Sequence, residues 1–506
     1  MENSAAEEPE VREGEEMSTE APATPGQTLE RRAVGLPTAI GTTFGLIVAS
    51  TVMASIAAGF FASYVFLVAI VIGLIAMYLQ SMSFSELATM IPKAGSMNEY
   101  VRPALGPFFA SLTVLVGYVA VQLFPTAAES FTPSVVIHDF LGADFFSVRL
   151  WVIILVVFVA IVNVAGIRPY ARVEVLLTGM IAISLLAFGI IGMTGAGSGH
   201  TIGGLFPHVA FTWDTLWTLL GIAVFTFVGM EYTCPLAEEL RNPGRDIPLG
   251  IFLGLALVSV PIIAFGLAGA RYVPADKLGA FSPVAHMDVA VAVLGNGGKW
   301  WIGFVSIAAT LSTLNALLAG IPRIFYGMAL TRQLPRGFSY LLPATRAPVV
   351  GIVVVALMPI LMNVFIDLAK SSHFIELILA GVLGWATAYI LIHLSVIILR
   401  LRYSATRRPF RSPLFPLPQI LGGALLVLAA IKIFPDPTVR HHIYRDYGIF
   451  IGVAVVLALA YNGFSYRSLT AQFRPVPLDE VYRETEAIEE ELPLPVEPGP
   501  SPHPSG

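Results

Sequence analysis

A glutamate inside a long apolar segment is the residue best placed to do chemistry in this sequence. Glu231 is the first charged side chain of WTLLGIAVFTFVGMEYTCPLAEEL, which begins at Trp217. An ionisable group in such a segment costs several kcal/mol and is retained for a reason. A carboxyl in surroundings of low polarity favours its neutral form, which suits uptake and release of a proton. Glu231 is therefore our candidate for proton coupling; the alternative is that a neutral Glu231 joins two helices by a hydrogen bond.

Polar groups recur at helical spacing in an earlier apolar segment. Tyr118, Gln122, Thr126 and Glu129 are three or four residues apart. A helix places such residues on one face, and we expect this face to line a cavity. Glu129 lies near the end of its segment, so an interfacial position is the better explanation for it.

A second polar cluster consists of Ser312, Thr313 and Asn315. Hydroxyls can bond to carbonyls of their own helix, so the first two are weak indicators of a site. The Asn315 amide needs several partners and is a stronger candidate. Phe225 and Phe227, which flank Thr226 just before Glu231, could cover a bound molecule, although an aromatic side chain in a span more often packs. The lower-ranked candidates are Glu376, Trp385, Tyr389 and His393.

The composition determines the setting of these residues. The 506 residues are 56% hydrophobic and 12% charged, about half the charge of an ordinary soluble domain. So much apolar surface cannot be hidden in a globule, so we expect a protein that faces the lipid bilayer. The arginines are scattered over separate loops, which argues against a nucleic-acid partner. The single cysteine, Cys234, excludes an intrachain disulfide.

The hydropathy pattern predicts an all-α integral membrane protein with about twelve spans, each about 20 residues long. The predicted spans are 38–62, 65–90, 106–132, 148–166, 171–195, 214–238, 248–272, 299–330, 347–369, 374–399, 416–435 and 446–465. The segment SPVAHMDVAVAVLG, between the seventh and eighth spans, is too short to cross and is expected to form a re-entrant or surface helix.

Arginine and lysine concentrate in the loops that share a side with the N-terminus, which places both termini in the cytoplasm of a plasma-membrane protein. The N-terminal tail, 1–33, is acidic and has no apolar core typical of a secretory signal. The predicted permeation domain is 34–466. The segment 467–506 is acidic and proline-rich, and both tails are expected to be disordered.

Two spans show signs of interruption. The first has small and hydroxyl residues through its middle, and the sixth has Gly229, Glu231 and Pro235. They stand five spans apart, the spacing at which inverted-repeat transporters place the broken helices that form the substrate site. The alternative is that the small residues only permit close helix packing.

The histidines are dispersed, and the sequence has no metal-ligand spacing, phosphate loop or nucleophile elbow. We therefore expect neither an enzyme nor a cofactor. Because the sequence has no ATP-binding motif, transport by this chain would have to be driven by an ion gradient or by exchange.

The sixth span, FVGMEYTCPLAEELRNPGRDIPLGI, resembles the signature region of the amino acid/polyamine/organocation permeases. LSTLNALLAGIPRIFYGMALTRQLPRGF is similar to the eighth span of that family, and LRYSATRRPFRSPLFPLPQI to its link into the eleventh. The resemblance covers about residues 33–466. It implies a five-plus-five inverted repeat of the leucine-transporter type, followed by two C-terminal helices, and import or exchange of amino acids or related amines.

Carried over by position, the resemblance makes Phe225 an aromatic gate, Gly229 the unwound point of the sixth span and Glu231 an acidic residue linked to the response to pH. In the first span, the amides of an unwound segment would bind a substrate carboxylate. The family has a glycine-rich triplet where this chain has Met53, Ala54 and Ser55. This departure puts carboxylate recognition in doubt and favours an amine or another unusual substrate.

The resemblance also concerns the coupling ion. Ser312 and Thr313 fall where sodium-coupled relatives have hydroxyl ligands, and the fifth span lacks the lysine that replaces sodium in some proton-coupled members. The coupling ion is therefore H+ or Na+.

The sequence thus predicts a secondary transporter that works by alternating access, and the alternative is a sensor or partner-binding protein on the same fold. The predicted substrate-binding residues are Ala49, Ser50, Met53, Ala54, Ser55, Tyr118, Gln122, Phe225, Thr226, Gly229 and Asn315, with Glu231 for proton coupling and Ser312 and Thr313 for a possible sodium site. Nothing in the sequence indicates an oligomeric state.

Overall fold

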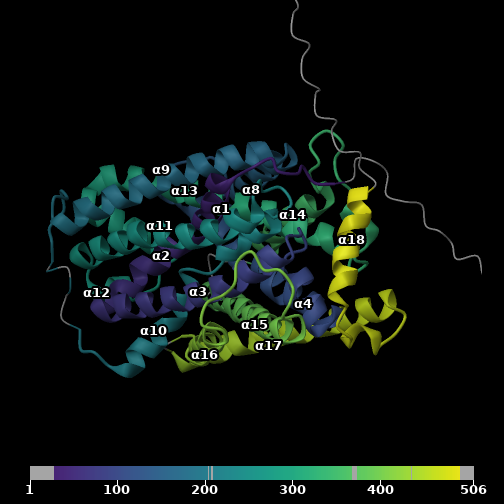
Figure 1. Cartoon of the computed structure of the whole chain (residues 1–506). Helices are drawn as coiled ribbons and strands as arrows, with labels where there is room; N and C mark the ends of the chain where they lie inside the picture. The colour runs from purple at the N-terminus through teal and green to yellow at the C-terminus, as the bar shows by residue number, and fades with distance from the viewer. Residues whose placement is uncertain are drawn as a thin grey trace, which may run out of the picture.

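The computed structural model describes residues 28–202, 204, 206, 209–366, 373–434 and 436–490, which fold into helices packed side by side (Figure 1). The first half contains α1 (Leu36–Ile47), α2 (Ser50–Gly59), α3 (Tyr64–Met90), α4 (Met97–Leu105), α5 (Pro107–Val114), α6 (Ala120–Leu123), α7 (Pro125–Val135), α8 (Val148–Val164) and α9 (Ile167–Thr194). The second half contains α10 (Trp213–Phe225), α11 (Pro243–Tyr272), α12 (Ala275–Leu278), α13 (Ala285–Leu330), α14 (Val349–Phe365), α15 (His373–Arg402), α16 (Leu417–Ile431), α17 (Pro437–Ser465) and α18 (Leu478–Glu490). Short 3-10 or π turns, η1 (Phe60–Ala62), η2 (Leu115–Val119), η3 (Val136–Phe140), η4 (Met230–Leu236), η5 (Arg336–Ser339) and η6 (Ala471–Phe473), join or extend them.

The predicted spans are confirmed as helices, with ends that differ by a few residues in most of them. Within the described residues, eight helical segments and the bent pair α1 and α2 are long and apolar enough to cross a membrane. The shorter apolar helices α8, α14 and α16 coincide with the remaining three predicted spans. The end of the ninth predicted span, 367–369, lies outside the described residues.

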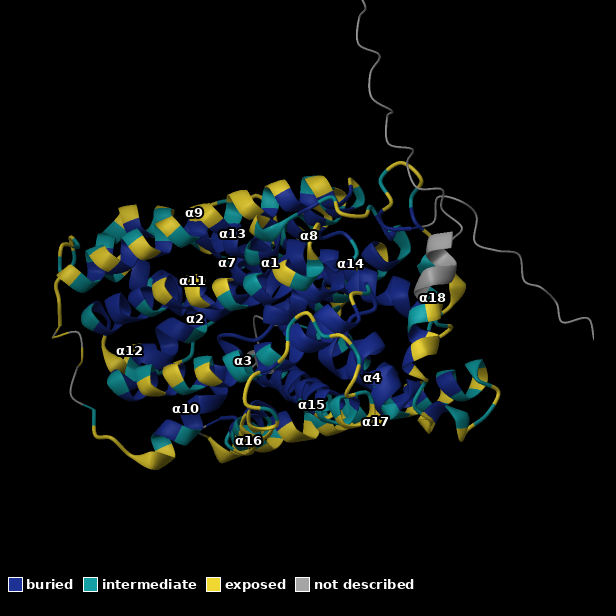
Figure 2. Ribbon diagram, in the orientation of Figure 1, coloured by how far each residue is buried: buried dark blue, intermediate teal, exposed yellow. Residues whose placement is uncertain are grey.

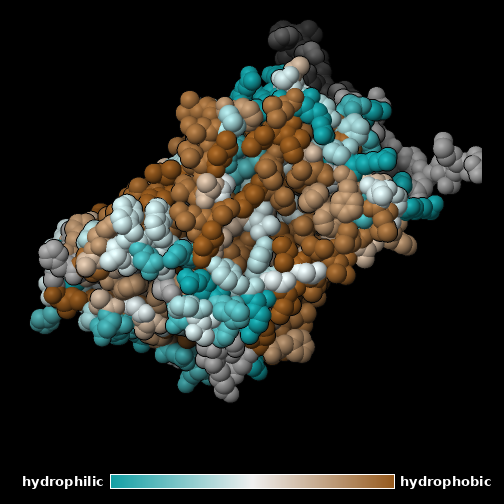
Figure 3. Space-filling view, turned by 90° about the horizontal axis from the view of Figure 1, so that it is seen from below, coloured by the Kyte–Doolittle hydropathy of each residue, from teal (hydrophilic) through white to brown (hydrophobic). Residues whose placement is uncertain are grey.

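The outer surface is apolar, as a lipid-facing protein requires. On α9, the side chains of Leu176 and Ile183 are 72% and 73% exposed. Exposed residues lie along the outer sides of α9 and α17, whereas the centre of the bundle is buried (Figure 2). Hydrophobic residues cover much of the face seen in Figure 3, and hydrophilic residues gather towards its margins. An apolar outer surface of this kind is what a bundle of helices facing lipid requires.

The first span is broken between α1 and α2, which meet at an angle of 54°. The break consists of Val48 and Ala49, with φ/ψ of −82°/30° and −53°/152°. Both φ values are negative, so the chain leaves the helix without needing a glycine. We call Val48 and Ala49 the first break. It lies before Met53, Ala54 and Ser55, where the family resemblance implied the unwound segment; these three residues lie within α2.

The sixth span is broken between α10 and η4, at residues 226–229, which we call the second break. Gly229 has φ +97°, a conformation that favours glycine. A Cβ atom there would lie 1.7 Å from Cδ2 of Leu46, near the end of α1. The Thr43 hydroxyl of α1 also donates to the carbonyl of Met230, at 3.1 Å. The two predicted interruptions are therefore real and lie against each other.

The structure also shows the short helix predicted before the eighth span and the full length of the third span. Gly295, with φ +57° and ψ −136°, separates Ala285–Leu294 from the eighth span, so the predicted short helix before that span exists. The third span is longer than predicted, because π turns carry it on to Phe140. Such turns often mark functional positions in helices.

The chain after residue 466 differs from the expectation of disorder, as far as it is described. The apolar side chains of Leu478 and Val481 on α18 are buried, and the Tyr482 hydroxyl donates to a carbonyl at the end of α3. Arg102 of α4 donates two hydrogen bonds to the Glu484 carboxylate. The physical reason is an amphipathic helix, whose apolar residues recur at intervals of three and four and whose acids meet basic partners. In Figure 1, α18 lies across one end of the bundle.

Candidate functional site

A small cavity lies where the two breaks meet. It measures about 30 Å³ and is lined by Leu46, Ala49, Thr51, Val52, Val121, Pro125, Thr126, Glu129, Phe225, Val228, Thr313, Leu317 and Trp385. We call it the central cavity. Ligand pockets usually hold about 300 to 1,000 Å³, so the central cavity must expand before it can take up a small organic molecule.

Glu129 of α7 is the charged residue of the central cavity, and it caps the helix that begins at the first break. Its Oε1 accepts from the amide of Ser50 at 2.9 Å, and its Oε2 accepts from the amide and the hydroxyl of Thr51, both at 2.8 Å. The Thr310 hydroxyl of α13 donates to Oε1 as well. These are the amides at the start of α2, where a helix binds negative charge. The carboxylate of Glu129 thus joins three spans at the first break.

The prediction that Glu129 is interfacial is wrong. Glu129 is only 2% exposed, and the third span continues for eleven residues beyond it, to Phe140. The helix that carries Glu129 continues beyond the end of its apolar run, so the residue lies deeper than hydropathy indicates.

Glu231 lies at the second break and is fully buried. Its Oε2 accepts a hydrogen bond of 2.5 Å from the hydroxyl of Tyr389, and that hydroxyl accepts from the amide of Gly229 at 3.1 Å. Trp385, one turn earlier on α15, neighbours the carboxyl and lines the central cavity. Two residues of α15 therefore connect Glu231 to the cavity and to the unwound backbone.

Glu174 of α9 is a third buried carboxylate, which the sequence analysis missed. It accepts from the Ser312 hydroxyl at 2.6 Å and from the Asn315 amide at 2.7 Å. The oxygen of Asn315 in turn accepts from Asn163 of α8 at 2.9 Å. The rule that selected Glu231, an acid inside an apolar span, applies equally to Glu174 and would have found it.

The cluster around Glu174 lies close to α1 near the first break. A Cβ atom on Gly45 would lie 1.9 Å from Oε1 of Glu174, and the Thr313 hydroxyl donates to the Gly45 carbonyl at 2.9 Å. Ser312 and Asn315 therefore share the Glu174 carboxylate, whereas Thr313 bonds to the backbone of α1. Thr313 also faces the central cavity.

The other predicted residues divide into two groups. Ala49 and Phe225 line the central cavity, and Ser50 supplies one of its capping amides. The side chains that do not line it are those of Met53, Ala54, Ser55, Tyr118, Gln122, Thr226 and Asn315.

Several residues of that second group have structural partners instead. The Gln122 amide donates to the carbonyl of Val355 on α14, at 2.9 Å, and the Thr226 hydroxyl donates to its own helix. The ring of Tyr118 stands edge-on to that of Tyr232, with centroids 5.1 Å apart. Of the polar face predicted for the third span, Thr126 and Glu129 reach the cavity.

Of the four lower-ranked candidates of the tenth span, two lie in the site and two lie outside it. Trp385 and Tyr389 belong to the site, as described. Glu376 accepts from or donates to His442 of α17, at 2.9 Å, away from the cavity. His393 contacts the Ser83 hydroxyl at 2.8 Å and lies outside the cavity lining.

Comparison with known proteins places this arrangement in context. The profile of the amino acid permease family matches residues 35–467. The chain is 27% identical over 353 residues to the vacuolar cationic amino acid transporter 4 of Arabidopsis thaliana, which covers 65% of this chain and 56% of the relative's length. It is 24% identical over 365 residues to the human cystine/glutamate transporter, covering 71% of each protein. An uncharacterized transporter of Mycobacterium tuberculosis is 30% identical over 349 residues, covering 65% of this chain and 73% of the relative.

Solved structures with a similar fold are transporters as well. A nucleobase-cation-symport-1 family transporter in a closed conformation superposes with a TM-score of 0.54 at 18% identity, covering 92% of this chain and 99% of that one. A Na+-coupled sialic acid symporter in an outward-open state gives a TM-score of 0.52 at 13% identity, covering 78% and 89%. At these identities the likeness concerns the fold alone.

Proposed function

The chain belongs to the amino acid permease family, and we propose that it is a secondary transporter that moves amino acids or related amines by alternating access. The observation that carries the proposal is the central cavity, which lies between two broken helices that touch each other. Broken helices expose backbone N–H and C=O groups to which a substrate can bind. Because these groups line a cavity inside the protein, they are not exposed to lipid. The alternative of a non-transporting sensor is not favoured by the family or by the fold.

The cycle requires that the central cavity open in turn to each side of the membrane. At about 30 Å³ it is closed to an amino acid. Contacts at one end of the bundle support the closed form: Arg323 of α13 donates to both carboxylate oxygens of Glu239, just after η4, and both residues are buried. Separating a buried, bidentate ion pair of this kind leaves a charge without a partner and is costly. Such a pair can therefore hold a gate closed.

We assign proton coupling to Glu231. The assignment is supported by its complete burial, by the hydrogen bond from Tyr389 and by an Oε1 atom that accepts no hydrogen bond from the described residues. Its neighbour Trp385 lines the central cavity, so movement of a substrate can be transmitted to the carboxyl. Glu231→Gln removes the titrating group while keeping the shape of the side chain.

The test is uptake of radiolabelled amino acids and amines by proteoliposomes over a range of pH. Wild-type uptake should depend on pH, and Glu231→Gln should flatten that dependence. Glu376→Gln, which changes a buried carboxyl outside the cavity, is the matched control and should keep the wild-type profile. A wild-type pH profile in Glu231→Gln would refute the role of Glu231.

Sodium is the alternative coupling ion. Ser312 and Thr313, with the Glu174 carboxylate and the Gly45 carbonyl beside them, offer the hard oxygen atoms that such a cation prefers. Replacing Na+ by choline in the uptake buffer at constant pH separates the two ions. Loss of uptake would assign the coupling to sodium.

The chain is a multi-pass membrane protein, and we place it in the plasma membrane with both termini in the cytoplasm. The distribution of arginine and lysine over the loops supports this orientation. Fluorescent fusions to either end, combined with an external quencher, test it, and quenching in intact cells would contradict it.

A further inference from the structure

We propose that Glu129 is a built-in carboxylate that occupies the anion seat of the first break, so that the transporter recognises the cationic group of an organic amine and does not require a substrate carboxylate. This inference rests on the proposed transport function and adds the substrate class. It begins with the amides of Ser50 and Thr51, which open α2 and would otherwise be available to an anionic ligand.

Those amides are already paired. Each oxygen of Glu129 accepts two hydrogen bonds, one from an amide of α2 and one from a hydroxyl, which uses the usual capacity of a carboxylate. A substrate carboxylate in the same place would lose these donors and would lie beside a like charge. The first break is thus complete without the acidic group of an amino acid.

The rest of the central cavity suits a cation. Its lining contains no lysine, arginine or histidine, and its charged residue is Glu129. Two aromatic side chains, Phe225 of α10 and Trp385 of α15, also line it. Aromatic faces and a carboxylate together attract an organic ammonium in surroundings that exclude water. Because two of the four donors to Glu129 are rotatable hydroxyls, they can turn away and leave room for an ammonium.

The experiment compares each amine with the amino acid from which it differs by one carboxylate. Suitable pairs are agmatine and arginine, cadaverine and lysine, and tryptamine and tryptophan. Binding is measured by the thermal stabilisation of purified full-length protein, and transport by competition in proteoliposomes. In the wild type, at least one amine should bind at least about tenfold more tightly than its parent amino acid.

The variant Glu129→Ala frees the amides of Ser50 and Thr51 and removes the negative charge, so the preference should fall by at least about tenfold or reverse. Glu376→Gln is the control and should keep the wild-type ratio. If Glu129→Ala does not fold, the ratio of amine to amino acid affinity in the wild type still tests the proposal. Tighter binding of every amino acid than of its amine would overturn this inference while leaving the transport function intact. Failure of all six compounds to bind or be transported would count against the transport function itself.

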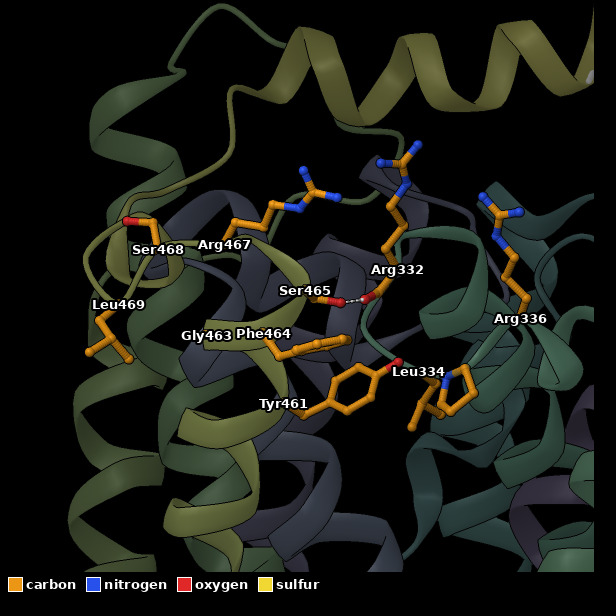
Figure 4. A pocket seen from close by; sticks show the side chains of 11 residues that line it. Arg332, Leu334, Arg336, Tyr461, Gly463, Phe464, Ser465, Arg467, Ser468 and Leu469 are labelled. Carbon is orange, nitrogen blue, oxygen red and sulfur yellow. Dashed lines mark hydrogen bonds between the residues drawn. The ribbon is translucent and has the colours of Figure 1, made fainter. Parts of the chain in front are cut away.

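A second pocket, which we call the arginine pocket, lies at the end of α13 and α17, where η5 meets the chain that follows α17. Figure 4 shows the guanidinium groups of Arg332, Arg336 and Arg467 on one side of it, with Tyr461 and Phe464 on the other. Arg332 and Arg336 already interact with other groups of the protein, so this pocket adds no ligand site to the proposal above.

Discussion

The hydroxyl of Tyr389 joins α15 to the second break, and removing it gives a quantitative test of that connection. In Tyr389→Phe, Oε2 of Glu231 loses its donor and the amide of Gly229 loses its acceptor. A buried polar group left without a partner costs roughly 1 to 3 kcal/mol, so the free energy of unfolding should fall by roughly 2 to 6 kcal/mol if both groups stay dry. The ring itself, which packs on Phe84 with centroids 5.3 Å apart, is retained.

The chain offers a matched control in Tyr118→Phe. Tyr118 is as completely buried as Tyr389, yet its hydroxyl has no hydrogen-bond partner among the described residues. Its loss should change stability by less than about 0.5 kcal/mol or be slightly stabilising, because nothing is left unpaired.

Unfolding can be followed with a thiol-reactive fluorophore, since Cys234 is the single cysteine and is buried. The label reacts only when the bundle opens, and titration with sodium dodecyl sulfate gives the difference in unfolding free energy between variants. Equal destabilisation by the two tyrosine variants would refute the reasoning, since it would show that the hydrogen bonds at the second break contribute nothing.

Two further predictions concern the backbone and the gate. Gly229→Ala should cost roughly 1 to 3 kcal/mol, because the residue has φ +97° and the new Cβ would overlap Leu46, whereas Gly448→Ala on α17, where a Cβ meets open space, should be neutral or slightly stabilising. Arg323→Gln should cost about 3 to 5 kcal/mol by leaving the buried Glu239 carboxylate without its partner, and adding Glu239→Leu should recover most of the loss. The same fluorophore assay measures both, and a neutral Gly229→Ala or a double variant no better than Arg323→Gln would contradict them.

The sequence predicts the fold well because lipid imposes a strong rule on it. A span needs a long apolar run, and each predicted run coincides, where it is described, with one helix or a broken pair of helices. The second break was also predictable, since Gly229 adopts a conformation that few other residues tolerate. The first break was located less well, because Val48 and Ala49 bend the chain with ordinary φ values and so leave no glycine signal.

The candidate site was predicted only in part, and each omission has a physical cause. Glu129 looked interfacial because the π turns that lengthen its helix to Phe140 cannot be read from hydropathy. Gln122 and Tyr118 lie on the same helix face as Glu129. Their side chains contact α14 and η4, respectively, and so do not line the cavity. The packing of α18 depends on Arg102, almost 400 residues earlier, which no local pattern reveals.

The central claim is that a substrate passes through the cavity between the two breaks. It is tested most directly by counterflow, in which proteoliposomes loaded with an unlabelled amine or amino acid accumulate the labelled compound from outside. Ala49→Phe places a ring in a cavity of about 30 Å³ at the first break. We predict accumulation by the wild type and none by Ala49→Phe, with both proteins folded and monodisperse. Wild-type counterflow by Ala49→Phe, or none by the wild type with any amino acid or amine, would contradict the account.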